Sequence, residues 1–142
     1  MIYYAPFEAW HLGSIKLQES QEWVRGFFVG ADLVSLEGPH AMTVYSDGAP
    51  VACGGAIGFG DGRACLWSFM GSNIGPREFV KVHAITKRLI DAMPFRRLEM
   101  YVDCDFENGH RWARLLGFDM ECERMKSFQA NGADSALYAM VK

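Results

Sequence analysis

The pattern of hydrophobic and polar residues is clearest between residues 63 and 118. Ala64–Met70 is apolar apart from Ser68, which predicts a strand buried on both faces. A glycine-bearing turn follows, and a long helix is predicted to begin at Pro76 and to stop at Pro94. Its apolar residues recur every three or four positions, as on one face of a helix. They are Phe79, Val82, Ile85, Leu89 and Met93.

A second strand and a short helix are predicted after this long helix. Leu98–Val102 alternates between apolar and polar residues, and Asn108–Leu116 reads as a helix that ends at Gly117. A strand–helix–strand unit of this length implies a right-handed crossover between parallel strands. The amides of the turn after the first strand then point into a crevice, which suits an anion. Ser72 and Asn73 are the two residues of this turn that are able to cap the long helix.

The N-terminal part of the chain predicts a strand, one or two helices and a connector. Met1–Ala5 is the strand, residues 6–30 contain the helices with Ser20 as a cap ahead of Trp23, and Ala31–His40 is the connector. The acidic residues of these helices have two interpretations: they face a substrate, or they form the solvated side of amphipathic helices, which is the usual place for such charges. These residues are Glu8, Glu19 and Glu22.

Two hairpins should precede the long helix and one should close the chain. Ala41–Tyr45 and Val51–Cys53 flank a turn at Asp47-Gly48, and the next hairpin turns at Gly60–Gly62. Gly54, Gly55 and Gly58 indicate a bulge or a close approach of another backbone or a ligand. At the C-terminus, the strands 118–128 and 136–141 are joined through a turn at Asn131-Gly132. The fold class is therefore α/β with a mixed sheet.

Composition narrows the class of protein. The chain has 142 residues, half of them hydrophobic, which predicts one packed domain over residues 1–142. A net charge of −3 argues against nucleic-acid binding through a general basic field. There is no run of 18 apolar residues, so no membrane partner is expected. The cysteines lack metal-ligand spacing, and they are expected to be structural thiols in a reducing cytoplasm. They are Cys53, Cys65, Cys104 and Cys122.

This order of elements resembles the GNAT fold, that of the Gcn5-related N-acetyltransferases. Glu107–Phe118 resembles the family's fourth helix, which commonly starts with Asn and closes in Gly-Phe, and Arg124–Lys142 is similar to its closing hairpin. A finer resemblance is to small GNAT-like proteins of tailed bacteriophages, some of which are linked to virion assembly. The residues that carry it are Trp67, Gly71-Ser72, Phe79, Val102-Asp103, Arg111-Trp112 and Leu116-Gly117-Phe118.

The resemblance implies a GNAT-like mixed sheet of six to seven strands, acetyl-CoA as cofactor and acyl transfer to an amine of a small molecule or protein. Two departures weigh against activity. Met70–Arg77 does not match the Gln/Arg-x-x-Gly-x-Gly/Ala turn of the enzymes, and Pro76 removes one amide. Ala113 stands where the family often has a tyrosine that protonates the leaving thiolate.

The candidate cofactor site is the turn before the long helix and the first turns of that helix. Its residues are Met70, Gly71, Ser72, Asn73, Gly75, Arg77 and Lys81. An ordinary glycine-containing loop would look the same. The resemblance adds Asn108, which would hold the pantetheine arm of the cofactor or, alternatively, cap the last helix.

Asp103, Asp105 and His110 are the candidates for proton transfer, because they cluster after the strand that ends at Val102. A histidine suits proton transfer at neutral pH. In the alternative interpretation the two aspartates shape the turn and His110 is an exposed helix residue. No metal site is expected.

A non-enzymatic function is the second hypothesis. The chain would then be a catalytically degenerate GNAT-like phage protein that acts through protein–protein contacts, or as a homo-oligomer, in virion assembly or host interaction. Its aromatic residues exceed what a core of this size must hold, so some of them suit an interface, while core burial is the alternative for any single one. They include Trp10, Trp23, Trp67 and Trp112. The expected location is the bacterial host cytoplasm or the phage particle.

Overall fold

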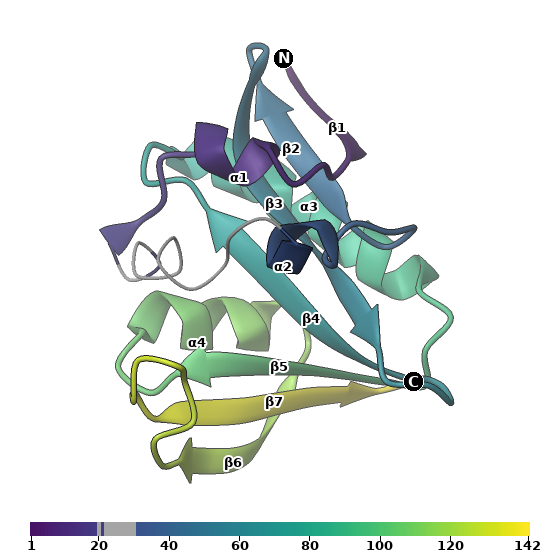
Figure 1. The fold of residues 1–142 in the computed structure, drawn as a ribbon, viewed down its shortest axis with the longest axis vertical. Helices are drawn as coiled ribbons and strands as arrows, with labels where there is room; N and C mark the ends of the chain where they lie inside the picture. Colours follow the sequence, from purple (N-terminus) through teal and green to yellow (C-terminus); the bar gives the residue numbers. More distant parts are fainter. Residues whose placement is uncertain (20, 22–30) are drawn as a thin grey trace. The chain divides into compact units, whose positions relative to one another are not determined.

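The structure is a computed structural model that describes residues 1–19, 21 and 31–142 (Figure 1). Its seven strands form one mixed sheet in the order β1-β2-β3-β4-β5-β7-β6, which confirms the predicted α/β class. The strands are β1 (Ile2–Pro6), β2 (Met42–Ser46), β3 (Ala49–Gly58), β4 (Arg63–Met70), β5 (Arg97–Asp103), β6 (Asp119–Met125) and β7 (Ser135–Val141). The helices are α1 (His11–Ser14), α2 (Ala31–Val34), α3 (Pro76–Ala92) and α4 (Glu107–Leu115).

The chain divides into two compact units, and each is described by itself. The first contains residues 1–57 and 67–93, and the second contains residues 58–66 and 94–142. Strand β4 contributes its C-terminal half to the first unit and its N-terminal half to the second.

In the first unit, β1, β2 and β3 form an antiparallel meander. The predicted turn is confirmed, since Asp47 and Gly48 have positive φ angles of 50° and 84°. The strand after it starts earlier than predicted, at Ala49. The register against β2 is irregular between Val44 and Tyr45, which pair with Ala52 and Pro50, so Val51 is the extra residue of β3. Gly54 pairs with Met42.

The glycines of β3 instead allow a close backbone approach. A Cβ atom at Gly55 would lie 2.6 Å from the carbonyl oxygen of His40 and 2.7 Å from the Cα atom of Ala41. A Cβ atom at Gly54 would lie 2.9 Å from the carbonyl oxygen of Trp67. The close approach of another backbone, the second interpretation, is therefore what the structure shows for Gly54 and Gly55.

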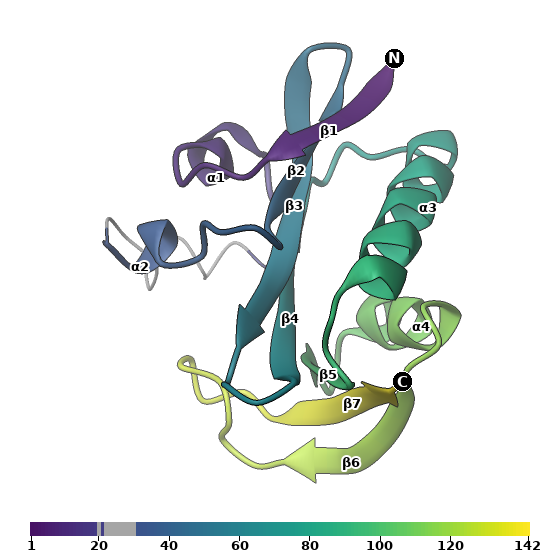
Figure 2. The ribbon, with the colours of Figure 1, turned by 90° about the vertical axis from the view of Figure 1, so that its right-hand side faces the viewer.

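Helices cover both faces of the meander, with α1 and α2 on one side of β2 and β3 and α3 on the other (Figure 2). A hydrophobic cluster lies on the α1 side. It consists of Phe7, Leu12, Ile15, Leu17, Ala41, Cys53 and Phe69. The connector predicted over Ala31–His40 contains the short helix α2, so that prediction is incomplete. The predicted second N-terminal helix, with its cap Ser20, lies outside the described residues.

Helix α3 begins at Pro76 as predicted and ends at Ala92, with Met93 as its C-cap. Its N-cap is Gly75, whose N–H donates to Oε1 of Glu78 at 3.2 Å. The prediction that Ser72 or Asn73 caps this helix is therefore wrong. The Glu78 carboxylate satisfies a free amide at the helix start, where negative charge is also favourable.

In the second unit, the first half of β4 pairs in parallel with β5, from Arg63 opposite Arg97 to Cys65 opposite Glu99. This confirms the predicted parallel pairing of the two strands. Strand β7 pairs antiparallel with β5 and β6. The first strand of the C-terminal hairpin, β6, is shorter than the predicted strand 118–128, because it ends at Met125. In the loop that follows, Gly132 has the positive φ of 84°, and the Asn131 side chain accepts the N–H of Ala133.

Helix α4 packs on the face of β5 and β7 that carries the buried apolar side chains. These side chains are Leu98, Val102, Ala136 and Tyr138 from the strands and Ala113 from the helix, with Leu116 and Phe118 after it. Apolar burial of this kind contributes about 25 cal/mol per Å².

The opposite face of this half-sheet carries a chain of alternating charges. Glu99 is only 3% exposed, and it forms ion pairs with Arg63 and, at 3.1 Å, with Arg97. Arg97 forms a second ion pair with Glu121 of β6, with 2.5 Å between a guanidinium nitrogen and Oε1. The Arg63 guanidinium, above all, holds the pKa of Glu99 below its ordinary value.

All four cysteines are free thiols. Burial raises the pKa of Cys53 to about 12 and that of Cys65 to about 11. Both groups are therefore protonated at neutral pH, which fits the predicted structural role. Among the described residues, no helix has the length and apolarity needed to cross a membrane.

Candidate functional site

The turn between β4 and α3 is the predicted anion cradle, and it belongs to the first unit. It follows Met70, the last residue of β4, and begins at Gly71, whose N–H donates to the carbonyl oxygen of Val51 at 2.8 Å. A Cβ atom at Gly71 would lie 2.7 Å from that oxygen and 2.9 Å from Oδ1 of Asn73. Glycine at position 71 is therefore required by the close approach of β3.

The amides of this turn already have acceptors inside the protein. Besides Gly71, the N–H of Ser72 donates to the carbonyl oxygen of Lys16 at 2.7 Å, and that of Gly75 donates to Glu78. Three of the four amides expected to face an anion are thus engaged in this conformation. An anion at this position would have to replace those acceptors.

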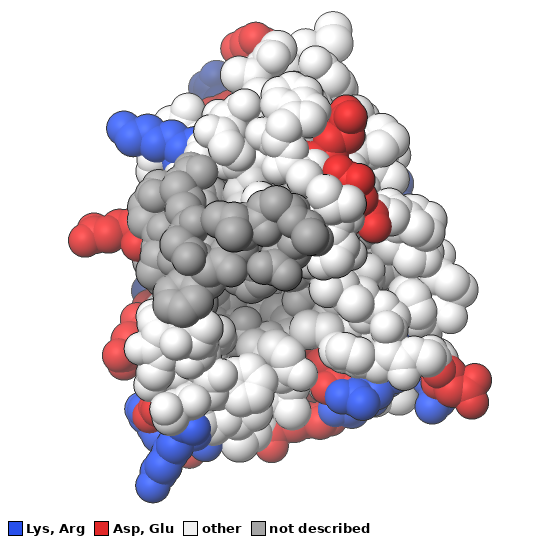
Figure 3. Space-filling view, in the orientation of Figure 1, with Lys and Arg blue, Asp and Glu red and all other residues white. Residues whose placement is uncertain are grey.

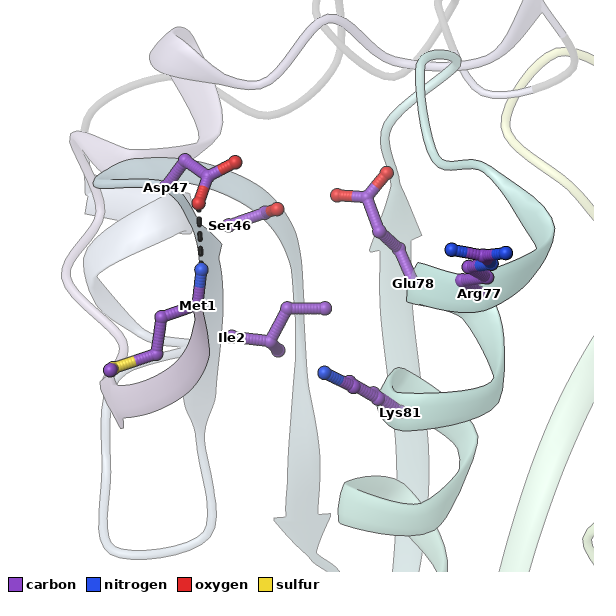
Figure 4. Close-up of a pocket in the computed structure, with 7 residues that line it drawn as sticks. All are labelled: Met1, Ile2, Ser46, Asp47, Arg77, Glu78 and Lys81. Carbon is purple, nitrogen blue, oxygen red and sulfur yellow. Dashed lines mark hydrogen bonds and ion pairs between the residues drawn. The ribbon is translucent and has the colours of Figure 1, made fainter.

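Arg77 and Lys81 line one pocket of about 280 Å³ beside the start of α3 (Figure 4). Its other lining residues come from the N-terminal strand, the β2–β3 hairpin and α3. They are Met1, Ile2, Ser46, Asp47 and Glu78. Glu78 and Lys81 extend from α3 toward Ser46 and Ile2 (Figure 4). The structure thus brings together Arg77 and Lys81, two of the predicted cofactor residues, in one pocket. They lie near the N-terminus of α3, and a helix N-terminus favours anions.

Carboxylates balance the two cations of this pocket. The amino group of Met1 lies 2.7 Å from Oδ1 of Asp47 and lowers the pKa of that carboxyl. The Ser46 hydroxyl, followed by the Gly75 amide, lowers the pKa of Glu78. Both carboxylates are therefore ionised at neutral pH and partly neutralise the field of Arg77 and Lys81.

Asp103 and Asp105 belong to the second unit, at and just after the end of β5. Burial raises the pKa of Asp103, while a hydrogen bond from Ser135 opposes that shift and the charge of exposed Asp105 adds to it. Ser135 in turn accepts a hydrogen bond of 2.6 Å from Nε2 of Gln129. A half-buried carboxylate with a raised pKa is the kind of group that serves as a general base.

His110 is buried in the second unit, with 7% of its surface exposed, so its interpretation as an exposed helix residue is wrong. Its Nε2 atom lies 3.0 Å from the carbonyl oxygen of Cys104, which can only accept. Nε2 therefore carries the proton in the neutral ring, and Nδ1 accepts from the Tyr138 hydroxyl at 2.8 Å. The two ring nitrogens thus connect α4 to Tyr138 of β7 and to the backbone of Cys104, just after β5.

Asn108 is exposed in the first turn of α4. The N-cap of this helix is Phe106, without a side-chain cap hydrogen bond, so the prediction that Asn108 caps the helix is wrong. The side chain of Asn108 therefore does not cap α4, and it is accessible from solvent. Asp103, Asp105, Asn108 and His110 thus lie in the second unit, whereas the turn, Arg77 and Lys81 lie in the first.

Sequence reasoning missed several residues that shape these sites. Ser46 forms a hydrogen bond with Glu78 in the pocket. Ser135 forms one with Asp103, and Tyr138 forms one with His110. Each of these bonds joins segments that are far apart in the sequence. Only Glu78 carried a local signal, since an acidic residue three positions after a helix cap is typical of a helix start. No group of three or more potential metal ligands occurs in the described part of the chain.

On the face shown in Figure 3, acidic and basic side chains of the described residues are interspersed around its edge. No continuous basic area is visible there among those residues. This distribution agrees with the modest net charge of −3.

Comparison with solved structures identifies the fold. Ard1 from Thermoplasma volcanium matches with a TM-score of 0.79 and 14% identity, over 99% of this chain and 97% of that chain. A GNAT-family acetyltransferase from Bacillus anthracis matches with a TM-score of 0.71 and 15% identity, over 99% and 94%. RimL, a ribosomal L7/L12 alpha-N-protein acetyltransferase solved in complex with coenzyme A, matches with a TM-score of 0.58 and 17% identity, over 72% and 62%.

This chain therefore has the fold of the GNAT acetyltransferases, which confirms the fold expected from the resemblance. Neither a protein-family model nor a curated protein sequence matches it.

Proposed function

We propose that this protein is an acetyl-CoA-dependent N-acyltransferase that acts on an amine of a small molecule or of a protein. The observation that carries the proposal is the likeness to Ard1, with a TM-score of 0.79 over 99% of the chain. Fold alone does not define an activity, so the roles of the residues rest on their own chemistry.

Arg77 and Lys81 are the proposed phosphate-binding residues, because both are cations in one pocket at the start of α3. The turn Met70–Gly75 borders this region, but its engaged amides leave most of the charge neutralisation to the two side chains and the helix N-terminus. Asn108, exposed on α4, is the proposed contact for the pantetheine arm. Acetyl-CoA, when bound, would supply the acyl group as a thioester.

Asp103 is the proposed base that takes a proton from the ammonium group of the acceptor. Its raised pKa gives its carboxylate more affinity for a proton than an ordinary aspartate has. Asp105 supports this through its negative charge. His110 remains a candidate, and its two hydrogen bonds favour a positioning role for the segment that carries Asp105. Ala113 offers no acid, so the departing thiolate would take its proton from water or from a nearby group such as His110, Asp103 or Asp105.

A second candidate function is supported by the engaged turn amides and by Ala113, which offers no acid. In this alternative the protein is a catalytically inactive GNAT-like phage protein that binds other proteins, in virion assembly or host interaction. Trp10, which is 59% exposed, is available for such an interface. The proposed location is the cytoplasm of a bacterial host or the phage particle.

Isothermal titration with acetyl-CoA tests the first proposal. It is combined with an assay of thiol release against a panel of small amines, lysine-containing peptides and proteins. Saturable binding together with release of CoA in the presence of an acceptor would support the acyltransferase. Absence of binding at millimolar acetyl-CoA, with no thiol release, would overturn it in favour of the interaction protein.

A further inference from the structure

Strand β1 forms one edge of the sheet and pairs with β2 alone. No described helix or strand lies beyond it (Figure 1, Figure 2). Past one end of β1, the N–H of Phe7 donates to the carbonyl oxygen of Ala41 at 3.0 Å. At the other end, the N–H of Asp47 donates to the carbonyl oxygen of Met1, also at 3.0 Å. Because backbone groups alternate in direction along a strand, the odd-numbered residues of β1 face β2 and the even-numbered ones face outward. The outward residues are Ile2, Tyr4 and Pro6.

The outward backbone groups have no partner in the described part of the chain. Ile2 and Tyr4 each present a free N–H and a free carbonyl oxygen, whereas Pro6 presents a carbonyl oxygen only. No residue of β1 has a charged side chain. A strand edge with free backbone groups and without charge is a template for pairing with another strand.

Two tyrosines give this edge a large contact area. Tyr3 is 45% exposed, and its ring lies parallel to that of Tyr45, with 5.1 Å between the ring centroids. Tyr4 is 40% exposed and, by strand alternation, lies on the opposite face of the sheet. Tyrosine suits an interface, because it buries much apolar area while its hydroxyl group remains hydrated.

A second copy of β1 matches these backbone groups when it runs antiparallel, with Tyr4 of both copies on a two-fold axis. The N–H of each Tyr4 then donates to the carbonyl oxygen of the other, as in a hydrogen-bonded pair of an antiparallel sheet. The N–H of Ile2 donates to the carbonyl oxygen of Pro6 in the second copy, an arrangement that requires no N–H from Pro6. Every outward N–H thus has an acceptor, so the strand is self-complementary.

The end of β1 at Pro6 is negatively charged. Glu8 follows it and is exposed, and the carboxylate of Glu37 accepts the N–H of Ala9 at 2.7 Å. Of the described residues, only His11 lies within ion-pair distance of either carboxylate, with its Nε2 atom 3.7 Å from Glu8. Burial lowers the pKa of His11, so its ring is neutral at pH 7 and leaves both negative charges uncompensated.

The end of β1 at Ile2 has the opposite charge. Lys81 extends toward Ile2 (Figure 4), and Arg77 lines the same pocket. The carboxylates of this pocket neutralise the two cations only in part, because Asp47 is paired with the amino group of Met1. In the antiparallel pair, the positive end of each copy lies beside the negative end of the other, and the two-fold axis repeats this contact.

We propose that β1 is a homodimer interface, through which two copies of this protein form one continuous sheet with Tyr4 at the two-fold axis. A second copy is the partner because the backbone groups and the charged ends of this edge complement themselves. A short interface of this kind dissociates at low protein concentration, with a Kd of about 1 μM–1 mM. The proposal is independent of the acyltransferase function, and its tests contain no cofactor.

Sedimentation equilibrium over a series of protein concentrations measures the dimer, and amide exchange locates its interface. The amide of Tyr4 should exchange more slowly as the dimer fraction rises, because the second copy accepts its hydrogen bond. The amide of Tyr3 faces β2, so its exchange should not depend on concentration. This difference between neighbouring residues distinguishes pairing at the β1 edge from association through any other surface.

Tyr4→Pro is the diagnostic variant, because it removes the outward N–H without removing a hydrogen bond to β2. It should raise the Kd of the dimer on the order of 10- to 100-fold, since two hydrogen bonds at the axis are lost. Tyr4→Lys should also weaken the dimer, because it places like charges directly opposite each other. Tyr4→Phe and, on the opposite edge strand β6, Met120→Lys should dimerise like the parent. Slow exchange of the buried Val44 amide shows that each variant is folded.

Glu8→Gln tests the charge complementarity of the two ends. It should raise the Kd of the dimer about 2- to 10-fold at low salt. The difference should disappear at high salt, where screening already weakens the parent dimer. Glu19→Gln, at an exposed position beyond α1, is the matched control and should leave the Kd unchanged.

Three results would overturn the proposal. The first is a protein that remains monomeric up to about 1 mM. The second is a dimer whose Kd is the same in the parent, Tyr4→Pro and Tyr4→Lys, since its interface would then lie elsewhere. The third is slower exchange of the Tyr4 amide on addition of an extended peptide rich in valine and threonine, without self-association, which would assign the edge to a different chain. None of these results depends on acyl-CoA binding.

Discussion

The Nδ1 atom of His110 and the hydroxyl oxygen of Tyr138 lie 2.8 Å apart, and both side chains are buried. This hydrogen bond joins the first turns of α4 to the middle of β7. Tyr138 is fully buried, so its hydroxyl has no water to replace the histidine.

Tyr138→Phe should therefore destabilise the fold by about 1–3 kcal/mol, because Nδ1 of His110 loses its donor inside the protein. Urea unfolding measures the effect. Tyr4→Phe is the control, since Tyr4 is 40% exposed, and it should change stability by less than about 0.5 kcal/mol. Equal stability of the two variants would contradict the buried hydrogen bond.

Asp103→Asn tests the proposed base. It should lower kcat by a factor of about 10²–10⁴ and leave the affinity for acetyl-CoA unchanged. In the parent, the rate should rise as pH increases through the raised pKa of Asp103, because only the carboxylate accepts a proton. Asp119→Asn, at an exposed position, is the control. A parent-like rate in Asp103→Asn would remove this residue from the mechanism.

Glu99 should make the fold sensitive to acid. Its pKa is lowered in the folded protein from the ordinary value of 4.5, so the unfolded chain takes up the proton first as pH falls. The stabilisation is complete above about pH 4.5 and is lost as pH falls through the folded pKa. Asp103, with its raised pKa, contributes in the opposite direction.

Glu99→Gln isolates the contribution of Glu99 from that of Asp103. It should cost about 1–3 kcal/mol at pH 7 and flatten the acid side of the stability profile, measured by urea unfolding from pH 3 to 7. Glu123→Gln, on exposed β6, should retain the profile of the parent. A profile of unchanged slope in Glu99→Gln would show that other carboxylates dominate.

Arg77→Ala should weaken acetyl-CoA binding by about 1.5–3 kcal/mol, the value of a hydrogen bond to a charged group. The loss should shrink at high salt, because Arg77 is exposed. Arg88→Ala, at an exposed position near the other end of α3, serves as the matched control. Calorimetric titration at two salt concentrations distinguishes a phosphate contact from a general charge effect, in which both variants would lose equally.

Gly55→Ala should destabilise the protein by about 1–3 kcal/mol, because the new methyl group would meet backbone atoms of His40 and Ala41 that cannot move independently. Gly13→Ala is the contrasting variant. Nothing lies within 4 Å of its added Cβ atom, and it should be neutral or stabilise by up to about 1 kcal/mol. Thermal unfolding of both variants compares them directly.

The sequence predicted those parts of the fold that depend on local patterns. The apolar run of β4, the alternation of β5, the Pro76 start of α3 and the Asp47-Gly48 turn are all encoded within a few residues, and the structure has these strands, this helix start and this turn. Short α2 lacked enough residues to produce a periodic signal.

The candidate site was predictable only as a set of residue types. Arg77 and Lys81 share a pocket, as their spacing on one helix suggests. His110 was misjudged because burial by β7 is a long-range effect that the pattern of α4 does not reveal. The contact of Gln21 with Met70 joins residues 49 positions apart, and a glutamine in a polar stretch gives no local sign of it.

Strand β6 forms one edge of the sheet, and exposed charges line most of its length. They are Asp119, Glu121, Glu123 and Arg124. Exposed strand edges are templates for adding a further strand, which leads to aggregation, and charged side chains counteract it. A second β6 laid against this one would bring like carboxylates together. The same strand that closes the half-sheet thus protects the protein from edge-to-edge polymerisation, and any self-association would have to use another surface.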